Sequence, residues 1–160
     1  MSIEGILRQC VARHLAPRRL HGDDSLRLAC SVSFREDASW ALDEEVPAEL
    51  RELWQACGEA RLFTDVDYGQ RGLVLLGPEV SWRRTSDQQY LRPADRRPGD
   101  VVIGEFLGDL ELLIYAGEAG DSRILVSLPL DPREDWYRVG NSLEEFLVKY
   151  VEHQGRKFWE

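Results

Sequence analysis

Residues 101–151 read VVIGEFLGDLELLIYAGEAGDSRILVSLPLDPREDWYRVGNSLEEFLVKYV, and this stretch decides the fold. Three short apolar runs, at 101–106, 110–115 and 123–130, are separated by turns that contain glycine. Such runs predict strands, and turns this short join antiparallel neighbours. Gly108 can take the positive φ that the first turn needs. The stretch therefore predicts an antiparallel meander of three strands.

The end of the same stretch carries the signals of a helix. Ser142 and Glu145 have the spacing of a capping box, in which the serine is the N-cap. An apolar stripe follows at helical spacing and consists of Leu143, Phe146, Leu147, Tyr150 and Val151. Gly155 is placed to end the helix in a left-handed conformation. The stripe predicts a helix that packs against the preceding sheet.

Upstream of this stretch, helical and extended patterns alternate. Residues 3–15 repeat apolar side chains at helical spacing up to Pro17, and a basic, polar connector is expected at 18–24. Residues 26–34 alternate apolar with polar side chains, which is typical of a strand with one solvent-facing side. The pair Asp23-Asp24 fits equally well as the cap of a short helix, so both alternatives stay open.

The middle of the chain predicts a second helix and two more strands. Pro47 suits the first position of a helix, and Gly58 is placed to end it. Short strands are expected at 61–63 and 73–76, with a glycine-containing turn between them. A short helix is expected after Pro78.

The composition is that of one globular domain. The chain has 160 residues, of which 43% are hydrophobic and 31% charged, an ordinary balance for a folded domain of this size. Its apolar runs are too short to span a bilayer. Charged residues interrupt the place where a signal peptide would have its apolar core. We therefore expect a single domain over residues 1–160, located in the cytoplasm.

The charge is acidic and unevenly distributed. The net charge is −9, and residues 36–160 carry 26 acids against 14 basic residues. The acids concentrate in 36–67 and in 100–135. A field of this sign repels nucleic acid and anionic membranes and attracts a basic partner. Solubility alone also explains acidity of this kind.

The cysteine pattern argues against a disulfide framework or a zinc site. Cys10, Cys30 and Cys57 are odd in number and widely spaced, without a C-x-x-C pair. Cys10 and Cys57 fall on the apolar sides of expected helices. Buried structural thiols are the interpretation that this pattern favours.

A search for catalytic motifs finds little. The sequence contains no H-E-x-x-H, G-x-S-x-G, Walker loop or G-x-G-x-x-G motif. Residues 65–69 begin like a calcium loop, but Gly69 comes one place early and Leu76 stands where the bidentate glutamate belongs. Acids are so abundant that sequence proximity does not single out a catalytic pair. We therefore expect a binding protein rather than an enzyme, with no cofactor and no metal.

The order of the motifs along the chain carries a further signal. The first amphipathic helix is followed by Val46-Pro47-x-x-Leu50-x-x-Leu53-Trp54 and then by Leu62-Phe63. Next comes Ile103-Gly104-x-x-x-Gly108-Asp109-x-Glu111-x-Leu113, and residues 136–140 lead into the helix at Ser142. In order and spacing, these motifs resemble the SUKH superfamily of fungal cell-wall-synthesis regulators and many bacterial proteins. The chain departs from that pattern at Cys57-Gly58-Glu59-Ala60, where the family usually has Asn-Gly-Gly.

The resemblance implies a fold and a function. The implied fold is α+β, with a mixed, largely antiparallel sheet against which the N-terminal and C-terminal helices pack. Bacterial members resemble immunity proteins, which bind and neutralise a toxin domain, in many cases one that attacks nucleic acids or nucleotides. The fungal members imply an alternative, a regulatory protein-interaction module without a toxin. Neither the bacterial nor the fungal members imply catalytic residues in this chain.

For the immunity function, the partner-binding residues are expected at two acidic turns and the strands beside them. Binding residues tend to lie on loops that a rigid scaffold holds. The candidates are Asp65, Asp67, Tyr68, Glu105, Asp109 and Glu111. The expected partner is a basic toxin domain encoded by an adjacent gene, and neither nucleic acid nor membrane is expected to bind.

Overall fold

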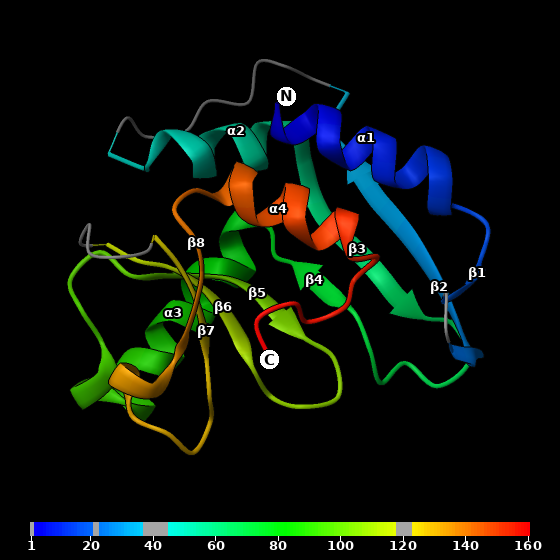
Figure 1. Cartoon of the computed structure of the whole chain (residues 1–160). Coiled ribbons are helices and arrows are strands. Elements are labelled where there is room, and N and C mark those ends of the chain that lie inside the picture. The colour runs from blue at the N-terminus through cyan, green and yellow to red at the C-terminus, as the bar shows by residue number, and fades with distance from the viewer. Residues whose placement is uncertain (1, 21–22, 37–44, 118–122) are drawn as a thin grey trace.

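One antiparallel sheet runs through the chain in sequence order. The computed structural model describes residues 2–20, 23–36, 45–117 and 123–160 (Figure 1). Within these residues the sheet has eight strands, and each pairs antiparallel with the next. The strands are β1 Arg18–Leu20, β2 Asp23–Phe34, β3 Cys57–Asp65, β4 Leu73–Leu75, β5 Val101–Phe106, β6 Leu112–Tyr115, β7 Ile124–Ser127 and β8 Tyr137–Gly140. The expected meander is confirmed as β5, β6 and β7.

Helices cover both faces of this sheet. In the described part of the chain the helices are α1 Ile3–His14, α2 Ala48–Ala56, α3 Pro78–Leu91 and α4 Leu143–Glu152, with short 3-10 turns η1 Pro93–Asp95 and η2 Arg133–Asp135. Helices α1, α2 and α4 lie together over one face, and α3 lies on the other (Figure 1). The expected α+β class, with N-terminal and C-terminal helices packed against a largely antiparallel sheet, is confirmed.

The central strands bury both of their faces, which explains why their sequences are continuously apolar rather than alternating. Val101 and Ile103 of β5 belong to the main core beneath α1, α2 and α4. Val102, between them, belongs to a smaller cluster on the α3 side. On β6, Leu113 likewise belongs to the main core and Ile114 to the cluster on the α3 side. The α3 side is therefore a separate layer with its own small core.

The closing helix forms as its sequence signals predict. Ser142 is the N-cap of α4, and its Oγ accepts a hydrogen bond from the Glu145 N–H at 3.0 Å. Glu145 in turn accepts the Asn141 N–H at 3.3 Å, one residue before the partner of an ideal capping box. Gly155 has φ +78, so the left-handed conformation expected after the helix is present.

Three expectations for residues 18–58 were wrong. Residues 18–24 contain β1 and the start of β2 rather than a connector. Residues 26–34 lie within β2, so the strand alternative holds and the helix alternative does not. Pro47 is the N-cap of α2 rather than its first residue. Gly58 lies inside β3, because pairing of Cys57 with Phe34 of β2 begins the strand directly after the helix.

The expected size of α3 was also wrong. This helix extends over 14 residues rather than one short segment. Ser81 is its one buried residue, so the sequence has no apolar stripe that marks its length. Further along, β8 is a strand where only a lead-in to α4 was expected. The turn expected at 117–122 falls largely outside the described residues. No helix in the described part of the chain has both the length and the apolar character needed to cross a membrane.

Candidate interaction surface

The two turns that carry most of the predicted partner residues meet at one end of the sheet. The β3–β4 turn covers residues 66–72, and the β5–β6 turn covers residues 107–111. Gly108 of the second turn has φ +94, and a Cβ there would lie 2.2 Å from the carbonyl oxygen of Gln70 in the first. Only glycine allows both this backbone conformation and this close approach. The fold therefore brings the two acidic turns together.

Asp65 supports its own turn. Its side chain is buried, and Oδ1 accepts hydrogen bonds from the N–H groups of Asp67 at 2.9 Å and Tyr68 at 3.2 Å. This is the local pattern in which an aspartate side chain replaces a backbone acceptor in a turn. A direct contact between Asp65 and a partner stays a prediction, and the structure gives this carboxylate an internal role.

Asp67 and Tyr68 lie on the outside of the same turn. Asp67 forms a two-pronged ion pair with Arg27 of β2, in which both carboxylate oxygens accept from the guanidinium. The hydrogen bond from Arg27 holds the pKa of Asp67 below its usual value. Tyr68 is 72% exposed. These two side chains can meet a partner without a change in the turn.

Asp109 and Glu111 of the other turn share one cation. Lys157 Nζ contacts a carboxylate oxygen of each residue, at 2.8 Å in the case of Glu111. Burial opposes the charge on Lys157, but the hydrogen bonds to Asp109 and then Glu111 raise its pKa. The same ammonium lies 5.5 Å from the ring centre of Phe106. Part of the negative charge expected at this turn is therefore neutralised within the protein.

Glu105 faces the α3 side of the sheet. Its carboxylate forms an ion pair with Arg84 of α3 at 2.9 Å, and both side chains are partly exposed. The structure thus places Glu105 beside α3, whereas Asp67 pairs with Arg27 of β2. The six predicted residues do not form one continuous acidic patch.

A groove with apolar walls lies between α3, the β5–β6 turn and the segment after β7. Its volume is about 650 Å³. Of the predicted residues, Glu105 and Glu111 are among its lining residues, whereas Asp65, Asp67 and Tyr68 do not line it. Its apolar lining includes Leu91, Leu107, Leu110, Leu112 and Pro129.

Leu110 is the most unusual residue of this groove. It has φ +62, a left-handed conformation that costs a leucine free energy. Its side chain is 82% exposed, so burial of the side chain does not offset that cost. Leu91, on α3, is 67% exposed in the same groove. Strained backbone that presents an apolar side chain to solvent is a mark of a binding position.

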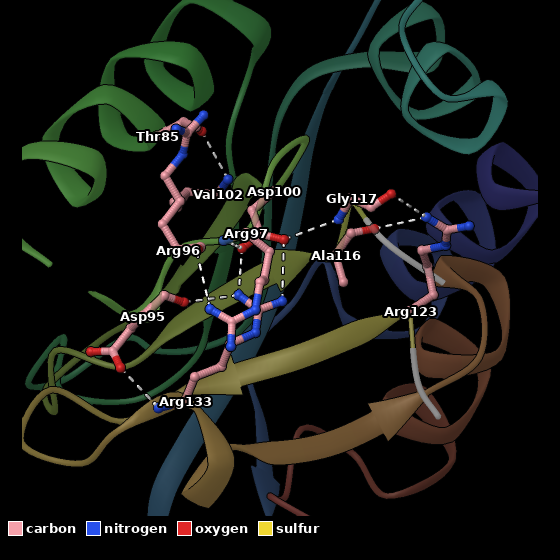
Figure 2. A network of polar contacts seen from close by, with 10 residues as sticks. All are labelled: Thr85, Asp95, Arg96, Arg97, Asp100, Val102, Ala116, Gly117, Arg123 and Arg133. Carbon is pink, nitrogen blue, oxygen red and sulfur yellow. Dashed lines mark hydrogen bonds and ion pairs between the residues drawn. The ribbon is translucent and has the colours of Figure 1, made fainter. Parts of the chain in front are cut away.

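A buried polar network joins η1, the start of β5 and η2 (Figure 2). Arg133 forms an ion pair with Asp100, and their side chains are only 14% and 10% exposed. Asp100 also accepts hydrogen bonds from the N–H groups of Arg97 at 2.9 Å and Gly117 at 3.0 Å. Arg133 further donates to the carbonyl oxygen of Asp95 at 3.0 Å. The network ties η1, β5 and η2 into one rigid unit.

Arg92, at the end of α3, extends this network to the groove itself. Its guanidinium donates to the carbonyl oxygen of Leu128 at 2.6 Å and to that of Asp131. The same side chain pairs with Asp95 at 2.8 Å. The segment after β7 is therefore held against α3, so the groove is a preformed feature of the scaffold.

Comparisons with protein-family models, with curated proteins and with solved structures found no match to this chain. The resemblance to the SUKH superfamily accordingly rests on the sequence motifs. In the described residues, no group of three or more His, Cys, Asp or Glu side chains is arranged to hold a metal ion.

Sequence reasoning missed the apolar part of this surface. Leu110 follows Gly108-Asp109, and an apolar residue at the tip of a tight turn is the local signal that points to it. Leu91 is the last residue of α3, a helix whose sequence has no apolar stripe to mark its length. The pairing of Glu105 with Arg84 joins residues 21 positions apart in sequence, and no local pattern indicates it.

Proposed function

We propose that this chain is an immunity protein of the SUKH type, which binds and neutralises a toxin domain encoded by an adjacent gene. The observation that carries the proposal is the preformed groove, in which exposed leucines lie beside carboxylates. The motif order described above supports the same assignment. The site of action is the cytoplasm, and the expected toxin acts on nucleic acids or nucleotides.

The chemistry of the groove suits a basic toxin surface. Leu91 and Leu110 offer apolar area that a partner can remove from water, which supplies most of the affinity of a typical interface. Glu105 in the groove and Asp67 on the β3–β4 turn outside it are exposed enough to exchange their internal arginines for basic groups of the partner. Such rim charges mainly accelerate association and select the partner.

Replacing Leu110 with aspartate should weaken binding of the toxin domain by about thirtyfold or more, the loss typical of an interface hot spot. The change places a charge where an apolar contact is expected and leaves the core untouched, because Leu110 is 82% exposed. The measurement is calorimetric titration with the toxin domain from the adjacent gene.

The matched control for this variant is Leu15→Asp. Leu15 follows α1, and its side chain is 66% exposed and does not line the groove. It should keep the affinity of the unchanged protein. Equal affinities for the unchanged protein, the Leu110→Asp variant and the Leu15→Asp variant would exclude the groove as the binding site.

The double variant Asp67→Ala/Glu105→Ala should slow association with the toxin domain, and the difference should shrink at high salt because salt screens exposed charges. Each acid takes part in a partly exposed ion pair with an arginine. Such pairs contribute about 1 kcal/mol or less, so stability should change little. Stopped-flow association rates at two salt concentrations test this.

Glu4→Ala/Glu59→Ala is the control for charge. These acids also pair with arginines, Arg8 and Arg61, in exposed positions outside both the groove and the β3–β4 turn. The two double variants remove equal charge. If both slowed association equally, net charge alone would explain the effect and the assignment of Asp67 and Glu105 would be wrong.

The regulatory alternative is distinguished by genetic context. A large secreted protein with a variable C-terminal domain, encoded next to this chain, supports the immunity function. A neighbouring gene without such a product supports a regulatory interaction module that uses the same groove.

A further inference from the structure

Two cysteines from different elements are in direct contact beneath α1. The Sγ atoms of Cys10 on α1 and Cys30 on β2 lie 2.8 Å apart, and both residues are almost fully buried. The third cysteine, Cys57, is also buried, but its Sγ contacts the carbonyl oxygen of Leu53 at 3.6 Å. Cys10 and Cys30 therefore form a thiol pair, whereas Cys57 is a buried thiol that belongs to no pair and can serve as a control.

The backbone opposite Cys30 is arranged to meet its sulfur. The register between β2 and β3 shifts from Ala29 opposite Thr64 to Ser31 opposite Arg61, so two residues of β3 stand against Cys30 alone. A bulge of this kind releases backbone groups from the ladder. One of the two, Phe63, has φ +54, and its N–H donates to Cys30 Sγ at 3.3 Å.

This arrangement makes the two thiols unequal. The hydrogen bond from the Cys10 thiol lowers the pKa of Cys30 despite burial, and the Phe63 N–H acts in the same direction. The hydrogen bond to Cys30, followed by burial, raises the pKa of Cys10. Because the thiolate is the nucleophile, Cys30 is the member of the pair that reacts first. Left-handed backbone at a buried phenylalanine is costly, which marks Phe63 as a position held for this contact.

We propose that Cys10 and Cys30 form an oxidisable dithiol that hydrogen peroxide converts to a disulfide, with Cys30 as the attacking thiolate and Cys10 as the resolving thiol. The short Sγ–Sγ contact, the bulge and the Phe63 N–H carry this assignment. It is independent of the toxin-binding function and of the groove beside α3.

The reaction has two balanced steps. The Cys30 thiolate attacks one oxygen of hydrogen peroxide, the O–O bond breaks, and the leaving hydroxide takes up a proton to form water. Cys30 is then a sulfenic acid. The Cys10 thiol attacks its sulfur, the S–O bond breaks, and hydroxide leaves with the Cys10 proton as a second water. In total, two thiols lose two electrons and one peroxide molecule is reduced.

A small uncharged oxidant suits the location of the pair. A groove of about 660 Å³ between α1 and α4 is lined by His14, whose ring centre lies 4.9 Å from that of Phe63. The sulfurs lie deeper, so oxidation takes place during local openings of α1. The disulfide would then fasten α1 to β2 across the intervening chain.

The test is oxidation of the full chain with hydrogen peroxide, followed by unfolding, alkylation of free thiols and mass spectrometry. We expect a loss of the mass of two hydrogen atoms, alkylation of Cys57 alone, and a peptide that links Cys10 to Cys30. The oxidised protein should melt about 6–12 °C higher than the reduced one, as expected for a crosslink that closes a loop of this size. Three alkylated cysteines, or a link that includes Cys57, would overturn the proposal.

Single variants separate the two roles. With Cys10→Ser, peroxide should add one oxygen atom to Cys30, and the product should react with dimedone, a reagent for sulfenic acids. With Cys30→Ser, Cys10 should stay reduced under the same conditions. Cys57→Ser is the control and should still form the Cys10–Cys30 link. Sulfenic acid on Cys10 in the Cys30→Ser protein would overturn the assignment of Cys30 as the attacking thiolate. The disulfide between Cys10 and Cys30 is itself tested in the unchanged chain, as described above.

Discussion

Replacing Phe146 with alanine should lower the free energy of unfolding by about 3–5 kcal/mol, the usual cost of removing a large aromatic side chain from a packed core. Phe146 is fully buried between α4 and the sheet. Its ring stacks on that of Tyr150 with centroids 5.5 Å apart, and Phe158 and Trp159 cover it from the end of the chain. These rings have partners of their own, so they can fill only part of the cavity.

In a thermal melt, this loss corresponds to about 6–20 °C for a domain of this size. Glu152→Ala is the control on the same helix, because Glu152 is exposed at the end of α4. It should change stability by about 0.5 kcal/mol or less. An unchanged melting temperature in the Phe146 variant would mean that α4 does not close the core.

Replacing Asp100 with alanine should also cost about 3–5 kcal/mol, because it leaves the partner of a buried ion pair without a counter-charge. The Arg133 side chain is 14% exposed, so water cannot readily take the place of the carboxylate. The change also removes the acceptor for the N–H groups of Arg97 and Gly117. Chemical denaturation of the variant measures the loss.

The double variant Asp100→Ala/Arg133→Ala should be less destabilised than the sum of its single variants, because it leaves no unpaired buried guanidinium. Glu4→Ala is the control for an exposed pair, since Glu4 pairs with Arg8 one helical turn away. It should cost about 0.5 kcal/mol or less. Equal costs for Asp100→Ala and Glu4→Ala would contradict the buried network.

The sequence predicts the central meander and α4 well because several local signals agree there. Ser142 and Glu145 cap the helix, and Gly108 takes the positive φ of its turn. The apolar runs of β5, β6 and β7 are buried on both faces, as continuous apolar strands require. Each of these features depends on residues that are close in sequence.

Features that depend on distant residues could not be predicted. Gly58 fits a helix stop locally, but pairing with β2 makes it part of a strand. Asp67 pairs with Arg27, 40 positions away, and Asp109 with Lys157, 48 positions away. Asp67 and Asp109 were therefore located correctly in their turns, while their internal partners and the groove beside α3 required the structure.

The most direct test of the proposed function is survival of bacteria that produce the toxin domain encoded by the adjacent gene. Cells that also produce this chain should grow, and cells that produce the Leu110→Asp variant at equal abundance should die or grow poorly. The Leu15→Asp variant should protect as well as the unchanged chain. Death of cells that contain the unchanged, folded chain would contradict the proposal that it neutralises this toxin.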